Sequence, residues 1–355
     1  MASARLRRAG VAVVALLATA SLLTGCQGRD SGASDEAKET GEGLVIGWSQ
    51  RGISGSDWWK TLVDGGQAEA DEIGARIELL DANGDTVRQN ADIQTLITKG
   101  VDVVVMNAND PIGVGPSVQA LADAGIPLVT VNSNLDPSLV SDMFCYVAED
   151  QEYTGSLAGE VAAKDALARF GDSGEIKVVG IGGFPGDVIS DLRFNGFMQG
   201  WDNVMKSQTG IETVTLETKY GEWKPDKALA PIRDVATANP DLKVVYSMSD
   251  VMNGGVIQGL KQAGLWGDGI ILASYDGGMV SVKEMMDNPD GPLRATASNQ
   301  PWDQGATAVK MAVAAYNGDQ SACPDKTLYI DTTVVTPDNA AEYYVADDTY
   351  VRAQD

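Results

Sequence analysis

The chain has 355 residues, a hydrophobic fraction of 44% and a formal net charge of −24 at pH 7. This length suits two domains, and so acidic a surface disfavours nucleic acid and anionic lipid as partners. Histidine is absent from the sequence, which excludes Ser-His-Asp and Cys-His catalysis, histidine-containing zinc sites and a histidine pH switch. We therefore expect an acidic globular protein with no cofactor, no bound metal and no nucleic-acid partner.

The amino terminus has the pattern of an export signal. Three arginines lie within the first eight residues, an apolar run follows at 10–23, and LTGC (23–26) resembles a bacterial lipobox. The apolar run is shorter than the roughly 20 residues that span a bilayer. We expect residues 1–25 to be a lipoprotein signal peptide, Cys26 to carry the lipid, and 26–43 to be a flexible tether. An uncleaved signal anchor or a buried Cys26 are the alternatives.

Two further cysteines, Cys145 and Cys323, remain in the exported part of the chain. An oxidising compartment permits a disulfide between them, because one remaining pair admits one connectivity. Two separate buried thiols are the alternative.

Apolar strands alternate with helical patterns along the first half of the chain. The expected strands are 44–48, 76–81, 101–106 and 126–131, with helices between them. The runs are continuously apolar, as in parallel strands that are buried on both faces.

The same alternation restarts after Glu149. The expected strands are 177–183, 213–218, 243–248, 270–276 and 295–299. QALADAG (119–125) precedes one strand, and the similar QGLKQAG (258–264) precedes another, 139 positions later. Two copies of one α/β unit explain this echo, and a chance match of one short motif is the alternative.

Open parallel sheets bind ligands beyond the carboxyl ends of their strands, so the residues that follow each strand are the candidate site. Most are Asp, Asn, Ser or Trp, and two facing sheets would point them into one cleft. The candidate ligand-binding residues are Ser56, Asp57, Trp58, Trp59, Asn132, Asp187, Asp191, Trp223, Ser249, Asp250, Asp276 and Asn299.

Each of these candidates also has a structural explanation. The polar residues Asp57, Asp187, Ser249 and Asp250 could serve only as helix N-caps, and Asp276 could form a turn before two glycines. The helical stripe that contains Trp59 predicts a core position for Trp59 and a ligand-facing position for Trp58, while Trp223 could cover a surface helix.

Indole faces stack on the C–H faces of a sugar, while carboxylates and amides bind its hydroxyl groups. The candidate positions hold several carboxylates and no arginine, so an anionic ligand is disfavoured. A neutral polyhydroxy compound fits, and so does a small cation such as an amino sugar.

Two other motifs partly resemble known site patterns. DANGD (81–85) looks like half of a calcium loop, but its glycine is misplaced and the bidentate glutamate is missing, so a strand end followed by a helix cap is preferred. GIGGFPG (180–186) has Pro185 where a dinucleotide fingerprint needs glycine.

From Leu44 to about Val335 the chain resembles the ribose-binding-protein-like group of type I periplasmic binding proteins, the sugar-capture subunits of ABC importers. The resemblance lies in DWWKTLVDGGQAEAD, IPLVTVNSN, DLRFNGF, SMSD, SYDGG and ASNQPWDQG. It implies an α/β fold of two similar Rossmann-like lobes with parallel sheets, joined by a three-segment hinge. The implied lobes are 44–147 with 300–332, and 148–299 with 333–355.

The resemblance also implies roles for individual residues. Trp58 and Trp59 take the place of an aromatic pair on one sugar face and Trp223 that of the aromatic on the other. Asn132, Asp276 and Asn299 match positions that bind hydroxyl groups, and Ser249, beside Asp250, stands where relatives often have asparagine. Asp191 and Ser133 stand where relatives often carry arginine. Arg193 lies two positions after Asp191, a turn of roughly 200° around a helix, and is expected to point away.

We therefore predict a lipid-anchored, extracytoplasmic, monomeric solute-binding protein that delivers a sugar or polyol to an ABC permease in the membrane. A sensor that passes ligand occupancy to a membrane receptor is the main alternative. An enzyme that uses paired aspartates (Asp187, Asp191, Asp250, Asp276) is a less favoured one. A transcriptional repressor is disfavoured by the export signal.

Overall fold

The computed structural model describes residues 40–54 and 56–354. The predicted signal peptide, Cys26 and the predicted tether up to residue 39 lie outside the described residues. Residues 40–43 form a turn in which the Gly43 N–H donates to the Gly74 carbonyl at 2.8 Å. The last residues of the predicted tether are therefore held against the folded chain.

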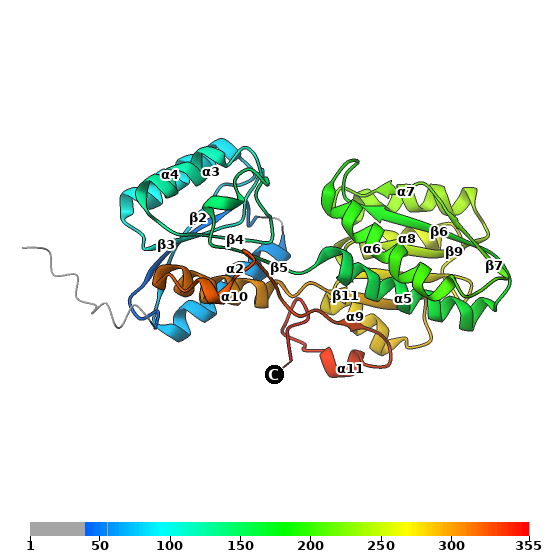
Figure 1. Cartoon of the computed structure of the whole chain (residues 1–355). Coiled ribbons are helices and arrows are strands. Elements are labelled where there is room, and N and C mark those ends of the chain that lie inside the picture. Colours follow the sequence, from blue (N-terminus) through cyan, green and yellow to red (C-terminus); the bar gives the residue numbers. More distant parts are fainter. Residues whose placement is uncertain (1–39, 55, 355) are drawn as a thin grey trace, which may run out of the picture. The chain divides into compact units, whose positions relative to one another are not determined.

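The first of two sheets contains six strands that all pair in parallel, in the order β12-β5-β4-β3-β1-β2. Its helices α3 and α4 lie on one face, and α2 and α10 lie side by side on the other (Figure 1). The strands are β1 (Val45–Gln50), β2 (Arg76–Asp81), β3 (Val103–Met106), β4 (Leu128–Val131), β5 (Cys145–Ala148) and β12 (Thr327–Tyr329). The helices are α2 (Asp57–Ile73), α3 (Thr86–Lys99), α4 (Gly115–Ala124) and α10 (Pro301–Asn317), with short 3-10 turns at Val140–Asp142 and Gln320–Ala322.

The second sheet has the order β13-β11-β10-β9-β6-β7. The short strand β8 pairs with the last residues of β6, after the part of β6 that pairs with β7. All of its pairs are parallel except β13, which runs antiparallel to β11. The strands are β6 (Gly174–Gly182), β7 (Ile211–Thr215), β8 (Lys219–Tyr220), β9 (Leu242–Ser247), β10 (Ile271–Asp276), β11 (Leu293–Ser298) and β13 (Val334–Val335). The helices are α5 (Gln151–Phe170), α6 (Val188–Met205), α7 (Pro225–Ala238), α8 (Asn253–Gln262), α9 (Met279–Asp287) and α11 (Ala340–Tyr343), with a 3-10 turn at Asp250–Met252.

The expected doubly wound α/β fold is confirmed, and each expected strand is present with ends shifted by a few residues. The sequence patterns missed β5, β8, β12 and β13, which have two to four residues each. Runs this short carry too few residues to show a periodicity. The continuous apolar runs have the expected cause, because β3, β4 and β10 are buried along their whole length.

The repeated motif has the same geometry in both halves. Gly125 ends α4 at φ 66°, and Gly264 follows α8 at φ 74°. In both, the next N–H reaches back five residues at 3.0 Å, from Ile126 to the Leu121 carbonyl and from Leu265 to the Leu260 carbonyl. The motif is therefore a glycine helix stop that turns the chain into the following strand.

Glycines allow two helix pairs to pack with their backbones in contact. A Cβ added at Gly65 of α2 would lie 2.2 Å from the Trp302 carbonyl oxygen of α10, and one at Gly305 would lie 1.9 Å from the Leu62 carbonyl. In the second sheet's layer, a Cβ at Gly159 of α5 would lie 2.0 Å from the Phe197 carbonyl of α6. Each pair fits only because these side chains are hydrogen atoms.

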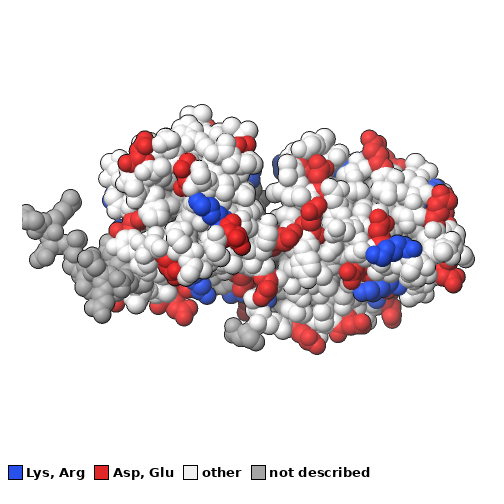
Figure 2. Space-filling view, viewed as in Figure 1, with Lys and Arg blue, Asp and Glu red and all other residues white. Residues whose placement is uncertain are grey.

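The chain passes from one sheet to the other at three places: 149–150, 299–300 and 330–333. A disulfide joins Cys145 of β5 to Cys323, which lies shortly before β12, with 5.9 Å between the Cα atoms. Within 40–54 and 56–354, every helix is too short or too polar to cross a bilayer. Acidic side chains outnumber basic ones over the helices of both sheets on the face seen in Figure 2, as the net charge requires.

Candidate ligand-binding site

A buried ion pair forms the centre of the candidate site. Asp276, at the end of β10, is 3% exposed and accepts from Arg193 Nη1 at 3.1 Å. The same carboxylate accepts from the Ser249 hydroxyl and from the Asn299 amide. Three of the candidate residues thus meet where β9, β10 and β11 end, as the strand-end rule predicts.

Asn299 connects this ion pair with the tryptophan helix of the first sheet. Its Nδ2 donates to Asp276 Oδ1 at 3.1 Å, and its Oδ1 accepts from Trp58 Nε1 at 2.8 Å. Asn299 is 1% exposed and occupies the crossover between β11 and α10. Candidate residues from both sheets are therefore joined in one hydrogen-bonded chain.

Arg193 belongs to the site, contrary to the expectation that it points away. It is 6% exposed, its Nη1 donates to the Met248 carbonyl at 2.7 Å, and its Nε donates to Gln151 Oε1 at 2.7 Å. Burial alone lowers the pKa of this guanidinium, but the charge of Asp276 offsets burial and the pKa is raised. Asp191, the residue preferred from the sequence, lies exposed on α6.

The error over Arg193 has a simple geometric cause. The buried stripe of α6 contains Ser190, Arg193, Phe197 and Gly200, spaced by three or four residues. Measured from Phe197 and Gly200, the helical period places Arg193 inward. The expectation that Arg193 points away assumed that Asp191 faces the ligand; because Asp191 is exposed, the same turn of roughly 200° places Arg193 inward as well.

Asp250 supports the fold around the site and has no capacity left for a ligand. Its two oxygens accept five hydrogen bonds, from Asn253, Ser274, Ser281, Thr296 and the Gly278 N–H. A carboxylate offers about four lone-pair positions. Burial raises the pKa of Asp250 to about 6. The prediction that Asp250 contacts a ligand is corrected accordingly.

The two tryptophans of α2 divide their roles differently from the expectation. Trp58 is 8% exposed and lies in the core cluster of the first sheet, whereas Trp59 is half-buried. Ser56 caps the helix by accepting from the Trp59 N–H at 3.3 Å, and Asp57 is its exposed first residue. Trp58 therefore reaches the site by its indole N–H.

Trp223 lies beside the Arg193 guanidinium, with 5.7 Å between the guanidinium carbon and the ring centroid. Its backbone has φ 55°, and its indole packs so tightly on Gly183 that an added Cβ would lie 1.9 Å from the ring. Gly183 directly follows β6. The glycine after this strand therefore provides the surface on which the third candidate tryptophan rests.

Asn132 and Asp187 occupy turn positions at the ends of β4 and β6. Asn132 is half-buried and has φ 61°, and its carbonyl accepts from the Tyr146 hydroxyl at 2.9 Å. Asp187 caps α6 and accepts from the Ile189 N–H and the Ser190 hydroxyl. The structural explanation holds for the Asp187 side chain, which is also half-buried.

The sequence patterns missed a second arginine, Arg51, at the end of β1. Its Nη1 donates to the Ser133 hydroxyl at 3.3 Å, and its guanidinium stacks on Trp59 at 5.2 Å from the ring centroid. Burial lowers the pKa of Arg51, and the charge of Asp187 opposes this. The strand-end rule would have selected Arg51, because it directly follows Gln50, the last residue of β1. The inventory that counted no arginine was therefore incomplete.

Glu149, at the first crossover, was also missed, and it links the crossovers to the ion pair. Its carboxylate accepts from Gln304 of α10 at 2.6 Å, from Tyr275 of β10 at 3.3 Å and from Gln151. Gln151 in turn accepts from Arg193. Burial raises the pKa of Glu149 to about 7. A single buried acid after a strand gives no sequence signal that separates it from a helix cap.

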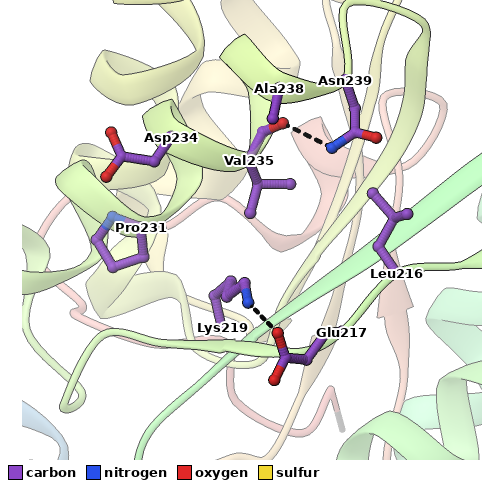
Figure 3. A pocket seen from close by; sticks show the side chains of 8 residues that line it. All are labelled: Leu216, Glu217, Lys219, Pro231, Asp234, Val235, Ala238 and Asn239. Atoms are coloured by element: carbon purple, nitrogen blue, oxygen red, sulfur yellow. Dashed lines mark hydrogen bonds and ion pairs between the residues drawn. The ribbon is translucent and has the colours of Figure 1, made fainter.

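A separate pocket of about 490 Å³ lies between α7 and the segment that joins β7 to β8 (Figure 3). Its polar side chains are engaged with protein atoms, Lys219 with Glu217 and the Asn239 amide with the Val235 carbonyl. It is lined by Leu216, Glu217, Lys219, Pro231, Asp234, Val235, Ala238 and Asn239. None of these is a candidate site residue. Within the described residues no group of His, Cys, Asp and Glu is arranged to hold a metal ion, and DANGD serves as the helix cap expected, with Asp85 capping α3.

Comparison with known proteins agrees with this architecture. A model of the periplasmic binding protein domain matches residues 46–320. The chain belongs to this family. A ribose import binding protein from Salmonella typhimurium is 27% identical over 261 residues, 73% of this chain and 81% of that protein. A xylitol-binding protein from Mycolicibacterium smegmatis is 27% identical over 266 residues, 74% of this chain and 69% of that protein.

Solved structures of the periplasmic binding protein family have the same two-lobed arrangement. An ABC transporter solute binding protein from Mycobacterium smegmatis with bound glycerol is 32% identical, with a TM-score of 0.72. The match covers 88% of this chain and 100% of that protein's chain. These relatives are binding proteins and not enzymes. The paired-aspartate enzyme is also disfavoured by the site itself, because Asp250 is saturated and Asp191 is exposed.

Proposed function

We propose that this protein captures a neutral sugar or polyol between its two lobes and delivers it to an ABC permease. The observation that carries the proposal is the bridge made by Asn299, which bonds Trp58 of one lobe and Asp276 of the other. A ligand that contacts the hydrogen-bonded series Trp58, Asn299 and Asp276 meets both lobes at once. We assign residues 44–147 and 300–332 to one lobe, and 148–299 and 333–355 to the other.

The polar groups favour a ligand with neighbouring hydroxyl groups. Arg193 donates, whereas Asp276 accepts hydrogen bonds from three side chains and also interacts with the Asp250 main-chain N–H, so a ligand hydroxyl would share its acceptor oxygens. A diol can donate to the carboxylate with one hydroxyl and accept from a guanidinium with the next. The half-buried rings of Trp59 and Trp223 supply apolar faces for C–H groups. The positive charge of Arg193 is matched by Asp276, so the pair adds no net charge that would select an anion.

Capture follows from differential affinity. A ligand held by groups from both lobes binds the closed arrangement more tightly than any open one, so binding shifts the population toward closure. The closed form would then dock on the permease. A sensor would use the same closure, and a permease and ATPase encoded beside this chain would favour import.

We also propose that Cys26 carries a diacylglycerol anchor that holds the protein on the outer side of the cell membrane. The support is the order of basic residues, apolar run and LTGC in the sequence. Replacement of Cys26 by Ala should move the protein from the membrane fraction to the medium or periplasm. Retention of the variant in the membrane would contradict a lipid anchor.

A thermal-shift screen followed by calorimetry tests the proposed ligand class. The panel contains D-ribose, D-allose, xylitol, glycerol, myo-inositol, glucosamine and ribose 5-phosphate. A ligand present at 100 times its Kd stabilises the fold by about 2.7 kcal/mol. We expect neutral members of the panel to raise Tm and the phosphate to leave it unchanged, whereas a response confined to glucosamine would favour a cationic ligand.

Matched variants separate binding at the site from binding elsewhere. Trp223→Ala removes a ring beside Arg193 and should abolish the shift, while Asp191→Asn changes an exposed acid of α6 and should leave it intact. If Trp223→Ala binds the panel normally while folded, the proposed site is wrong. If the phosphate gives the largest shift, the proposed ligand class is wrong.

A further inference from the structure

The C-terminal strap, residues 349–353, runs beside the loop that carries Asp276. The Met279 N–H donates to the Thr349 carbonyl at 2.9 Å, and the Val351 N–H donates to the Gly277 carbonyl at 2.8 Å. Gly278 and Tyr350 form an antiparallel bridge between these two bonds. The loop that follows Asp276 is therefore clamped by the main chain of the strap.

The strap divides its side chains between the two hydrophobic cores. Tyr350 is 5% exposed and belongs to the same buried cluster as Trp58, under the first sheet. Val351 is fully buried and belongs to the cluster of the second sheet. Neighbouring residues of an extended segment point to opposite sides, so the strap serves both lobes with two consecutive residues.

The end of the strap is held by α10 of the first lobe. The Arg352 guanidinium stacks on Trp302 at 3.7 Å from the ring centroid, and the Ala353 N–H donates to Asp303 Oδ2 at 3.0 Å. Trp302 packs its backbone against Gly65 of α2, the helix that begins with the two tryptophans. The strap thus connects the Asp276 loop to the helix pair that positions Trp58.

The Tyr350 side chain lies close to the acids of the site. Burial raises the pKa of its hydroxyl, and the negative charges of Asp276, Asp250 and Asp57 raise it further. These acids come from both lobes. The hydroxyl therefore stays protonated and sits in the field of the carboxylates around the ion pair.

We propose that the C-terminal strap is a fourth, non-covalent connection between the lobes, in which Tyr350 is a positioning residue that fixes the Asp276 loop relative to Trp58. The proposal rests on the proposed function, because it assigns the strap to the same ligand site. The three covalent crossovers act at 149–150, 299–300 and 330–333, whereas the strap acts directly at the loop after β10. It holds the two halves of the site in register before any ligand arrives.

The first experiment needs no ligand. The full-length chain is labelled with ¹⁵N-tryptophan, the indole signal of Trp58 is assigned with Trp58→Phe, and its N–H exchange with solvent is measured. This N–H is the donor to Asn299. Tyr350→Ala should speed its exchange at least tenfold. Tyr350→Phe, which keeps the ring, should leave exchange near the original rate, as should Tyr153→Ala at an exposed tyrosine.

The second experiment measures xylitol and D-ribose binding by stopped-flow fluorescence. Tyr350→Ala should raise the dissociation rate of the ligand at least fivefold with little change in the association rate, because the strap no longer holds the Asp276 loop in place relative to Trp58. A structural role alone would lower Tm and leave both rates unchanged. If neither compound binds the unsubstituted protein, the proposed function fails for these ligands, while the exchange measurement still decides the role of the strap.

Two milder variants keep the proposal testable if Tyr350→Ala does not fold. Arg352→Ala removes the stack on Trp302 together with the ion pair to Asp348, and removal of residues 352–355 leaves Tyr350 in place. Each should speed the exchange of the Trp58 indole N–H by at least threefold. Unchanged exchange in Tyr350→Ala, or in both milder variants when Tyr350→Ala is unfolded, would overturn the proposal.

Discussion

The Asp276→Asn substitution tests the ion pair at the centre of the site. It removes the negative charge from a side chain that is 3% exposed and leaves Arg193, 6% exposed, without its counter-ion. Breaking a buried pair by removing one partner costs roughly 3–5 kcal/mol, because the remaining charge is buried and uncompensated. We expect a value near 3 kcal/mol, since asparagine keeps one acceptor oxygen and the Met248 carbonyl still accepts from Arg193.

Urea unfolding at pH 7.5 measures this loss, and calorimetry with the best ligand of the panel measures affinity. We expect the affinity of Asp276→Asn to fall at least a hundredfold. The double variant Asp276→Asn/Arg193→Gln should recover part of the lost stability, because no unpaired charge is left. Asp241→Asn, which breaks an exposed pair with Lys177, is the control and should leave stability unchanged.

Three results would refute parts of the reasoning. A stability loss for Asp276→Asn below about 1 kcal/mol would mean that water reaches Arg193 and that the pair is not desolvated. A stable protein whose ligand affinity is unchanged would mean that the ligand contacts other residues. A double variant less stable than either single variant would indicate that both side chains act through separate contacts.

Three further predictions concern other parts of the site and fold. Gly183→Ala should lower ligand affinity at least tenfold in calorimetry, because the new methyl group displaces the Trp223 ring. Burial raises the pKa of Glu149 to about 7, above the value of 4.5 in the unfolded chain. The folded protein therefore binds the proton more tightly, and the unfolding free energy should fall by up to about 3 kcal/mol between pH 4.5 and pH 7. Glu149→Gln should flatten this dependence of the unfolding free energy on pH, as measured by urea titrations. Reduction of the bond between Cys145 and Cys323, 178 residues apart, should cost roughly 2–5 kcal/mol by thermal unfolding.

Each of these has a control or a contradicting outcome. Gly267→Ala adds a methyl group where no atom lies within 4 Å and should leave affinity unchanged. The Glu149 prediction fails if the difference in unfolding free energy between Glu149→Gln and the unsubstituted protein is the same at pH 5 and pH 8. An unchanged Tm after verified reduction would show that the disulfide does not constrain the unfolded chain.

The sequence was sufficient to predict the fold because the determining signals are local. Continuous apolar runs, helices between them and a glycine stop repeated 139 positions apart define a parallel, doubly wound unit twice. The strands that the sequence patterns did not predict, such as β5 with the residues CYVA, are short and pair with their neighbours only when distant segments come together. Their existence is a property of the assembled sheet and not of the local pattern.

The candidate site was predictable in part for the same reason. The strand-end rule finds Asp276, Ser249 and Asn299 because their place depends on the strand that precedes them. Arg193 lies in the middle of a helix and reaches the site by its length, so only the correct choice of the buried stripe of α6 reveals it. Glu149 is identified as a network member by its contacts with Gln304 and Tyr275, which lie more than 100 residues away.

The glycine-lined helix pairs restrict how this chain can be recombined with its relatives. Backbone carbonyls occupy the space where side chains would begin at Gly65 and Gly305, and likewise at Gly159 and Gly200. A chimera that pairs α5 of this protein with an α6 that lacks glycine at position 200 would insert a methyl group or more into a contact that has no room for one. Helices α2 and α10 come from opposite ends of the sequence, so a single splice point divides them. Successful domain grafting would therefore exchange both members of a pair, with at least two junctions in the gene.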